Sequence, residues 1–201
     1  MTTTKGASLM IVRFLAPGAL FLMAAAAAGC FNSGTLQQMQ EANQPYSISP
    51  DFELDRKWRI AILPPWFRDA EFPSLYDRAG LLLMKPGNFS LIDRSEVARI
   101  LHEQWSGGPR FIDSHSAWKL GRHMNAEAVM TVRVVEIRHD DFFKASPEQR
   151  DARLFVKIIS TDTGAALYYA EGSGSSFSGA DEALSGALTM ALDPLIRKAR
   201  E

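Results

Sequence analysis

The stretch AVMTVRVVEI at residues 128–137 is the most strand-like segment of this 201-residue sequence. It consists mostly of valine, threonine and isoleucine, whose branched side chains favour an extended backbone. Two more strands are predicted after it, at residues 154–160 and 165–170, and Asp162-Thr163-Gly164 between them is typical of a hairpin turn. These segments predict a β-meander in the second half of the chain.

A strand, a helix and a second strand are predicted upstream of the meander. Residues 59–63 and 89–92 have the composition of strands, and residues 73–84 between them place leucine and alanine near helical spacing. We expect Ser74 to cap this helix and Pro86-Gly87 to end it. The order indicates a βαβ unit at the front of the domain.

Two helices are predicted between this unit and the meander. The first runs from about residue 93 to residue 105, and Asp93 with Glu96 resembles a capping box at its start. The second ends near Met124 and is capped by either Asp113 or Ser114. Asn125 can close it because asparagine tolerates a positive φ.

A loop and a final helix follow the meander. Residues 172–179 are rich in glycine and serine and are expected to form a flexible loop. Residues 181–198 are expected to form a helix with acids at its start and bases at its end, which suits the helix dipole. Pro194 should kink or restart this helix, with Asp193 as the new cap.

The whole order is therefore β-α-β-α-α-β-β-β-α. It predicts the α+β class, with a mixed sheet of about four to five strands and helices packed against it in an α/β sandwich. A chain of this length suffices for one domain and a leader.

The first 29 residues have the parts of a secretory signal peptide. Lys5 and Arg13 precede an apolar stretch at residues 14–28, which spans roughly 22 Å as a helix and is short for crossing a bilayer. The run Ala27-Ala28-Gly29-Cys30 resembles the lipobox of bacterial lipoproteins. This resemblance implies cleavage before Cys30 and lipid attachment to that residue, which would anchor the protein to a membrane.

The resemblance also implies a location and a domain plan. In enteric-type sorting an aspartate after the lipidated cysteine retains a lipoprotein in the inner membrane, so Phe31 implies the outer membrane, with the domain facing the periplasm. We expect a signal peptide at 1–29, a lipidated N-terminus and flexible tether at 30–57, and a folded domain at 58–201. The tether is predicted because its sequence is polar and without a clear period.

Charge and cysteine content exclude two classes of protein. The part after the leader has 20 basic and 23 acidic residues, a net charge of −3, so nucleic-acid binding is not expected. Cys30 is the only cysteine, so no disulfide can form within the chain.

Four phrases resemble the CsgG-like superfamily of bacterial envelope lipoproteins. They are IAILPP at 60–65, FSLIDRSEVARIL at 89–101, AWKLGRHMNAEAVMTVRV at 117–134 and IISTDTGAAL at 158–167. The superfamily includes the curli secretion channel, lipoproteins of exopolysaccharide export and lipoprotein activators of a peptidoglycan synthase. The resemblance implies a small α/β domain without enzymatic activity that forms rings or docks on a larger partner.

Channel formation by this chain is not expected. The curli channel builds its barrel from long inserted hairpins, whereas the connection here, residues 139–152, is short and charged. It cannot supply two membrane-spanning strands of about 9–11 residues each.

The resemblance favours an assembly or scaffold component of an envelope export complex for polysaccharide or protein. Its partners would be further copies of this chain in a homo-oligomer, for which a ring is one form, and an outer-membrane or envelope protein. The alternative is a tethered activator of a peptidoglycan synthase. The tether's coil span of roughly 30 Å is short for crossing the periplasm, which ranks this alternative second.

No catalytic residue, cofactor site or metal site is expected. The four histidines, His102, His115, His123 and His139, lack i,i+4 ligand spacing. The segment at 172–176 precedes a helix, where anions can bind, but it lacks the lysine of a phosphate loop. A hydrolase using histidine and acids near residues 136–141 is the minor enzymatic alternative.

Four aromatic residues are candidate interface residues. Trp66-Phe67 and Phe142-Phe143 lie near the ends of predicted elements, and the second pair lies between charged residues. Exposed aromatic side chains favour contact with a partner, whereas core packing is the alternative explanation.

Overall fold

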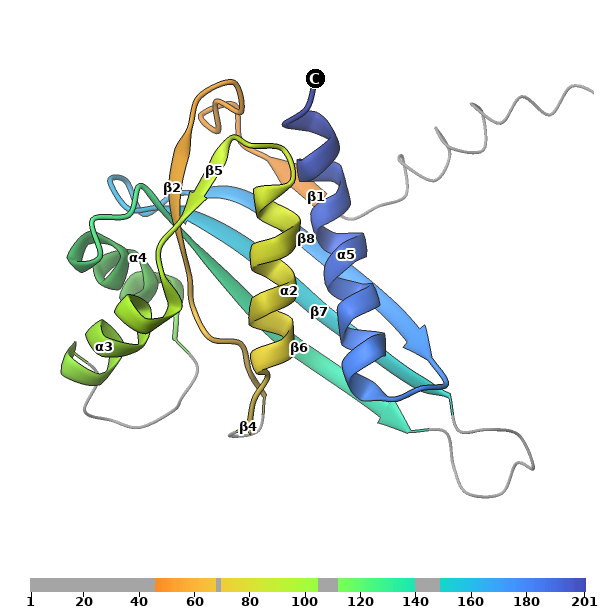
Figure 1. The fold of residues 1–201 in the computed structure, drawn as a ribbon. Helices are drawn as coiled ribbons and strands as arrows, with labels where there is room; N and C mark the ends of the chain where they lie inside the picture. The colour runs from red at the N-terminus through yellow and green to blue at the C-terminus, as the bar shows by residue number, and fades with distance from the viewer. Residues whose placement is uncertain (1–45, 68–69, 105–111, 140–148) are drawn as a thin grey trace, which may run out of the picture. The chain divides into compact units, whose positions relative to one another are not determined.

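The structure, a computed structural model, describes residues 46–67, 70–104, 112–139 and 149–201. It confirms the predicted α+β class, a mixed sheet with packed helices (Figure 1). The strands are β1 (Tyr46–Ile48), β2 (Trp58–Ile62), β3 (Trp66–Phe67), β4 (Ala70–Glu71), β5 (Phe89–Leu91), β6 (Ala128–His139), β7 (Arg150–Ser160) and β8 (Ala166–Ser176). The helices are α2 (Pro73–Met84), α3 (Arg94–Gln104), α4 (Ser114–His123) and α5 (Ala180–Lys198).

The main path of the sheet has the order β1-β8-β7-β6-β2-β5. β2 is parallel to β5 and β6, as the βαβ unit predicts, and β6, β7 and β8 form the predicted antiparallel meander. The sequence did not indicate β1, β3 and β4, so the strand count exceeds the expected four to five. These three strands are only two or three residues long, too short to show a period.

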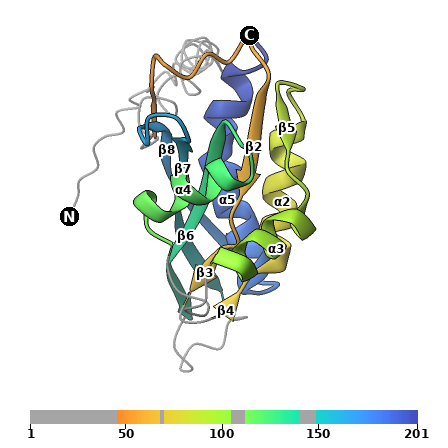
Figure 2. The same cartoon turned by 90° about the vertical axis from the view of Figure 1, so that its left-hand side faces the viewer.

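Helices α2 and α5 cover one face of the sheet, here called the inner face (Figure 1). Alternate residues of β7 point into this layer, and Leu154, Val156 and Ile158 are fully buried there. Helices α3 and α4 lie on the opposite side and pack against a smaller cluster that includes Val129 and Ile159 (Figure 2).

The folded part extends further toward the N-terminus than the expected boundary at residue 58. Tyr46–Ile48 pairs antiparallel with β8, and Phe52 is buried with its ring edge-on to Trp58, 5.0 Å between centroids. The Asn88 side-chain amide donates to the Leu54 carbonyl. Residues 46–57 therefore belong to the domain and not to a tether, because their apolar side chains complete its core.

The expected loop at 172–179 is instead largely strand, because β8 continues to Ser176. Glycine is required here by close packing and not by flexibility. A Cβ on Gly172 would lie 2.0 Å from the Ala187 carbonyl oxygen, and one on Gly174 would lie 2.2 Å from that of Ala183. The two glycines let α5 rest directly on the backbone of β8.

The helix ends agree with the sequence in part. Asp113, one of the two expected caps, accepts a hydrogen bond from the Ser116 amide at 2.6 Å, and Asn125 has φ 51° as predicted. The expected cap at Ser74 is wrong: Phe72 is the N-cap, without a side-chain hydrogen bond, and Pro73 begins α2. Proline suits this position because its fixed φ is helical and it lacks an N–H.

The expected restart of the last helix at Pro194 is wrong, whereas the alternative of a kink there stays a prediction. α5 is assigned as one helix through Pro194, and the Asp193 carboxylate pairs with Arg197 at 3.1 Å, one turn later in the helix. Pro194 is buried, as are Leu192 and Leu195 beside it. Burial of this apolar stretch compensates for the missing backbone hydrogen bond.

We predict that Gly172→Ala destabilises the domain by about 1–3 kcal/mol, because α5 must move away from β8. Gly186→Ala is the matched control: its Cβ would meet nothing nearer than 3.8 Å, and alanine favours a helix over glycine by about 1 kcal/mol, so stability should rise. Urea unfolding of both variants measures the two effects. Equal stability of Gly172→Ala and the wild type would contradict the packing argument.

Candidate interaction surface on the sheet

Among the described residues, the face of the sheet opposite α2 and α5 is covered at one end only. Figure 1 shows α3 and α4 near the end where β6 begins, while the strands of the meander run on away from them. The uncovered part is here called the outer face, and it is made of six residues of β6, β7 and β8. They are Arg133, Glu136, Arg153, Phe155, Tyr169 and Glu171.

Two aromatic rings stand at the centre of the outer face. Phe155 and Tyr169 stack with centroids 5.4 Å apart and planes inclined by 19°, and Tyr169 is 43% exposed. Stacking on Phe155 stiffens Tyr169 and leaves it accessible. A rigid, exposed aromatic residue on a sheet is well suited to contact a partner, since it loses little entropy on binding.

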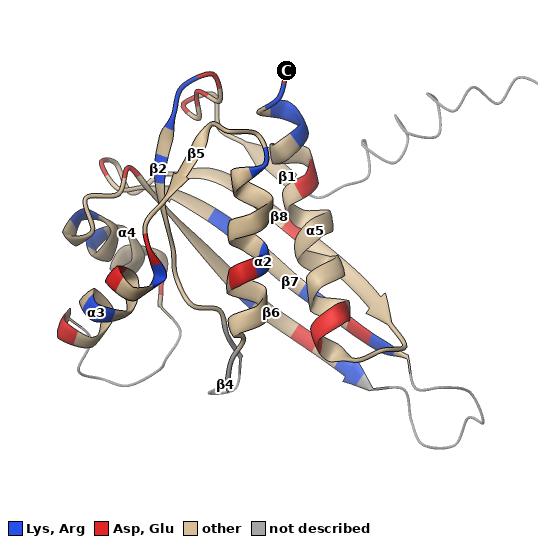
Figure 3. Cartoon of the chain, in the orientation of Figure 1, with Lys and Arg blue, Asp and Glu red and all other residues tan. Residues whose placement is uncertain are grey.

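Charged residues of both signs flank the aromatic pair. Arg153 lies between Glu136 and Glu171, at 3.7 Å and 3.6 Å, and Glu136 also pairs with Arg138. Exposed ion pairs of this kind contribute little to stability, about 0–1 kcal/mol each. Figure 3 shows acidic and basic segments side by side at this end of β6 and β7, a pattern that favours a selective protein contact over binding to a uniformly charged surface.

Hydrogen bonds shift the pKa values of two charged groups next to the outer face, Asp151 and Arg138. The Ser175 hydroxyl and the Gln149 amide bond to Asp151 and lower the pKa of its carboxyl. The Glu136 carboxylate raises the pKa of Arg138 by a hydrogen bond and by its charge. A hollow of about 340 Å3 beside these groups is lined by Glu136, Arg153 and Ser173 among others.

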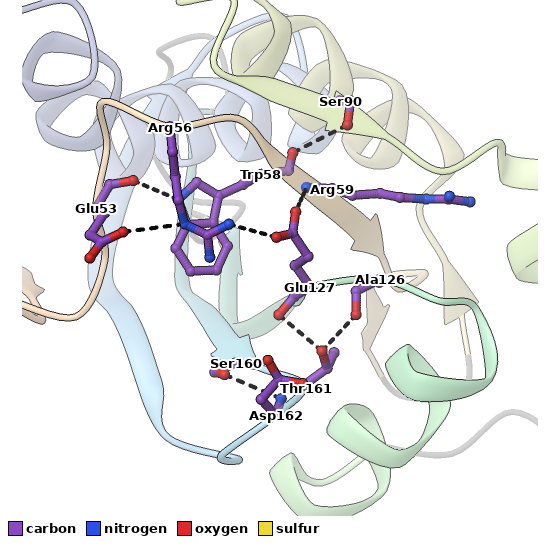
Figure 4. A network of polar contacts seen from close by, with 10 residues as sticks. All are labelled: Glu53, Arg56, Trp58, Arg59, Ser90, Ala126, Glu127, Ser160, Thr161 and Asp162. Atoms are coloured by element: carbon purple, nitrogen blue, oxygen red, sulfur yellow. Dashed lines mark hydrogen bonds and ion pairs between the residues drawn. The ribbon is translucent and has the colours of Figure 1, made fainter.

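A second polar network fastens the N-terminal segment to the start of the sheet (Figure 4). The Arg56 guanidinium lies 3.6 Å from the centroid of the buried Trp58 ring and donates to Glu127 at 2.6 Å. The same carboxylate accepts from the Arg59 amide at 2.8 Å. Glu127 therefore joins the chain before β2 to the turn before β6.

The pKa of Glu127 reflects this network. Partial burial raises the pKa of its carboxyl, but the hydrogen bonds from Arg56 and the Arg59 amide together outweigh burial and lower it. A carboxyl whose pKa falls on folding stabilises the fold above its unfolded pKa, and this stabilisation is lost as the pH falls through the folded value.

We predict that Glu127→Gln lowers stability by about 0.5–1 kcal/mol at neutral pH, the worth of a partly exposed charged hydrogen bond. The difference from the wild type should shrink at acid pH, as the pH falls through the lowered pKa of the folded Glu127 carboxyl and protonation removes its charge. Denaturant unfolding at both pH values checks this. Glu53→Gln is the control, because the Glu53 carboxylate is exposed and its ion pair with Arg56 is long, at 3.5 Å. This substitution should change stability little at either pH.

The structure describes the backbone of only two of the five site residues predicted from the sequence. Cys30, Phe142 and Phe143 lie outside the described residues. Trp66 and Phe67 form β3, whose backbone pairs with β4 and β6, and their side chains are not described. The interface role expected for these four aromatics therefore stays a prediction.

The four histidines are spread over three elements of the fold. His102 lies on α3, His115 and His123 lie on α4, and His139 ends β6. Within the described ranges no three histidine, cysteine, aspartate or glutamate side chains are close enough to hold a metal ion. Among the same residues, no helix is long and apolar enough to cross a membrane.

Sequence reasoning missed Phe155 and Tyr169. A usable signal was present in the alternation at residues 154–160, where Leu154, Val156 and Ile158 occupy one face and Phe155 the other. The sequence could not tell which of these two faces a helix covers, because both are apolar in part.

Comparisons with known proteins show the fold. No family model matches the chain, and no curated protein matches it. Lipoprotein GNA1162 from Neisseria meningitidis has 14% identity and a TM-score of 0.51, over 70% of this chain and 99% of that one. At this low sequence identity, the structural match supports a shared fold and no shared function.

Two further solved structures are less similar in shape. A PelC dodecamer from Paraburkholderia phytofirmans has 18% identity and a TM-score of 0.49, over 75% of this chain and 94% of that one. The LpoB C-terminal domain from Salmonella enterica has 10% identity and a TM-score of 0.44, over 61% of this chain and 85% of that one.

Proposed function

We propose that this chain is a lipid-anchored protein of the bacterial envelope, of the CsgG-like kind, that acts by binding other proteins and not by catalysis. Its specific role would be that of an assembly component in an export complex. The lipobox-like run ending at Cys30 supports the anchor. The fold shared with a Neisseria lipoprotein supports the same class.

The outer face is the observation that carries the contact function. An open sheet face with a rigid aromatic pair and balanced charges is what a protein interface presents before its partner binds. The partner would bury Tyr169 and pair with the charges around Arg153. A further copy of this chain is the first partner we expect, and an outer-membrane protein is the second.

The contact function predicts that full-length protein in detergent forms a defined oligomer that depends on Tyr169. Tyr169→Ser should weaken association roughly tenfold, about 1.4 kcal/mol, because the anchor of the interface is lost. Analytical ultracentrifugation with density-matched detergent measures this.

Leu81→Ser is the matched control for that experiment. Leu81 is 58% exposed on α2, which covers the other side of the sheet, so its loss removes exposed apolar surface away from the outer face. Equal effects of the two changes, or a monomer at every concentration, would refute assembly through this face. Cross-linking to a peptidoglycan synthase in cells would favour the activator alternative.

The anchor predicts that Cys30→Ser abolishes lipid attachment. Metabolic labelling with a fatty acid should mark the wild type only, and the variant should leave the membrane fraction, because acyl chains supply about 0.8 kcal/mol per buried methylene. An unmodified Cys30 thiol in the mature wild type, detected by mass spectrometry, would refute the anchor while leaving the interface test intact.

A further inference from the structure

The edge of β8 from Glu171 to Ser176 has no neighbouring strand among the residues that the structure describes. β7 pairs with β8 along its length, but on the other side β1 pairs only with Tyr168–Ala170. Figure 1 shows β8 continuing well past β1. A sheet edge of this kind is a template on which another strand can pair.

Three residues direct their backbone groups to this edge. The Ser49 amide donates to the Leu167 carbonyl at 2.8 Å, so Leu167 faces the β1 side. Successive residues of a strand alternate in the side to which their N–H and C=O groups point. Glu171, Ser173 and Ser175 therefore face the same side as Leu167, beyond the end of β1.

The chain's own N-terminal segment is a poor partner for these groups. Tyr46 lies opposite Ala170, so a chain continuing in this register would place Pro45 opposite Glu171. That position requires an N–H donor facing β8, and proline has none. The register of β1 thus leaves the edge available to another polypeptide.

A second copy pairing β8 with β8 is also a poor partner. α5 rests directly on β8 at Gly172 and Gly174. Paired strands lie about 4.8 Å apart, whereas packed helices need about 8–10 Å between their axes. The two α5 helices would collide, so the occupant must be an extended segment without a helix above it.

A groove beside the edge indicates which side chains this segment has. It holds about 610 Å3 and runs along α5 between Ser176 and Asp193. Gly186 leaves space in its floor, and the Met190 sulfur, which accepts from the Ser173 hydroxyl at 3.6 Å, is an adaptable apolar contact. Glu182 supplies a negative charge at the end beside Ser176, Arg78 supplies a positive charge where it donates to Thr189, and the charge of Asp193 is met by Arg197.

We infer that the β8 edge between Glu171 and Ser176 binds an extended segment of a partner polypeptide by strand addition. Its small apolar side chains lie toward Gly186 and Met190, and a basic side chain lies toward Glu182. This goes beyond the proposed function and does not depend on the lipid anchor or on the outer face.

A synthetic peptide tests the inference on full-length protein in detergent. The probe is an acetylated peptide of alternating valine and threonine flanked by lysines. Its binding should slow amide hydrogen exchange in the segment that spans Glu171–Ser176 and leave exchange in α3 unchanged. No slowing there at saturating peptide would overturn the inference.

Two variants locate the binding. Ser173→Pro removes an N–H that β7 does not use, so the domain should still fold while its affinity for the peptide falls about tenfold or more. Ser173→Ala is the control, because it keeps the N–H and should bind the peptide as the wild type does. Glu182→Lys should lower the affinity for the lysine-flanked peptide and raise the affinity for a glutamate-flanked one. This variant tests the site even if the proline variant unfolds. Unchanged affinity in all three, or self-association that Ser173→Pro abolishes, would overturn the inference.

Discussion

The close contact between α5 and the glycines of β8 sets the geometry of the whole domain. With no side chain at Gly172 and Gly174, the helix backbone reaches the strand backbone, and Tyr168 donates its hydroxyl to the Ala191 carbonyl within the same layer. Burial raises the pKa of Tyr168, so it remains a neutral donor. This contact keeps β8 extended to Ser176 and seals the inner face of the sheet against solvent.

Sealing one face has consequences for the other. The meander is long, while α3 and α4 are short and lie over its beginning, so the outer face has no cover within the described residues. Phe155 and Tyr169 stack there and support each other. The same placement of α5 over the edge strand leaves the backbone groups of Glu171, Ser173 and Ser175 open to an added strand. Both surfaces therefore follow from where α5 rests.

The N-terminal segment is held by a different kind of contact. Arg56 links the buried Trp58 ring to the Glu127 carboxylate, and Glu127 in turn holds the start of β2 through the Arg59 amide. A charge network of this kind depends on pH, unlike the apolar contact beneath α5. If Cys30 carries a lipid, the chain coming from the membrane enters the domain at β1, and this network holds the end of the segment that follows.

The sequence by itself determined the α+β class, the βαβ unit, the meander and the positive φ at Asn125, and it narrowed one helix cap to Asp113 or Ser114, because these depend on local periodicity and on turn chemistry. It also supplied the lipobox-like run, which lies outside the described residues. Tertiary structure decided the rest: that Gly172 and Gly174 belong to a strand, that Pro194 lies within one helix, and that Phe155 and Tyr169 form the outer face. The reason is physical. Both sides of β7 are apolar in part, and only the place where a helix packs decides which side is buried.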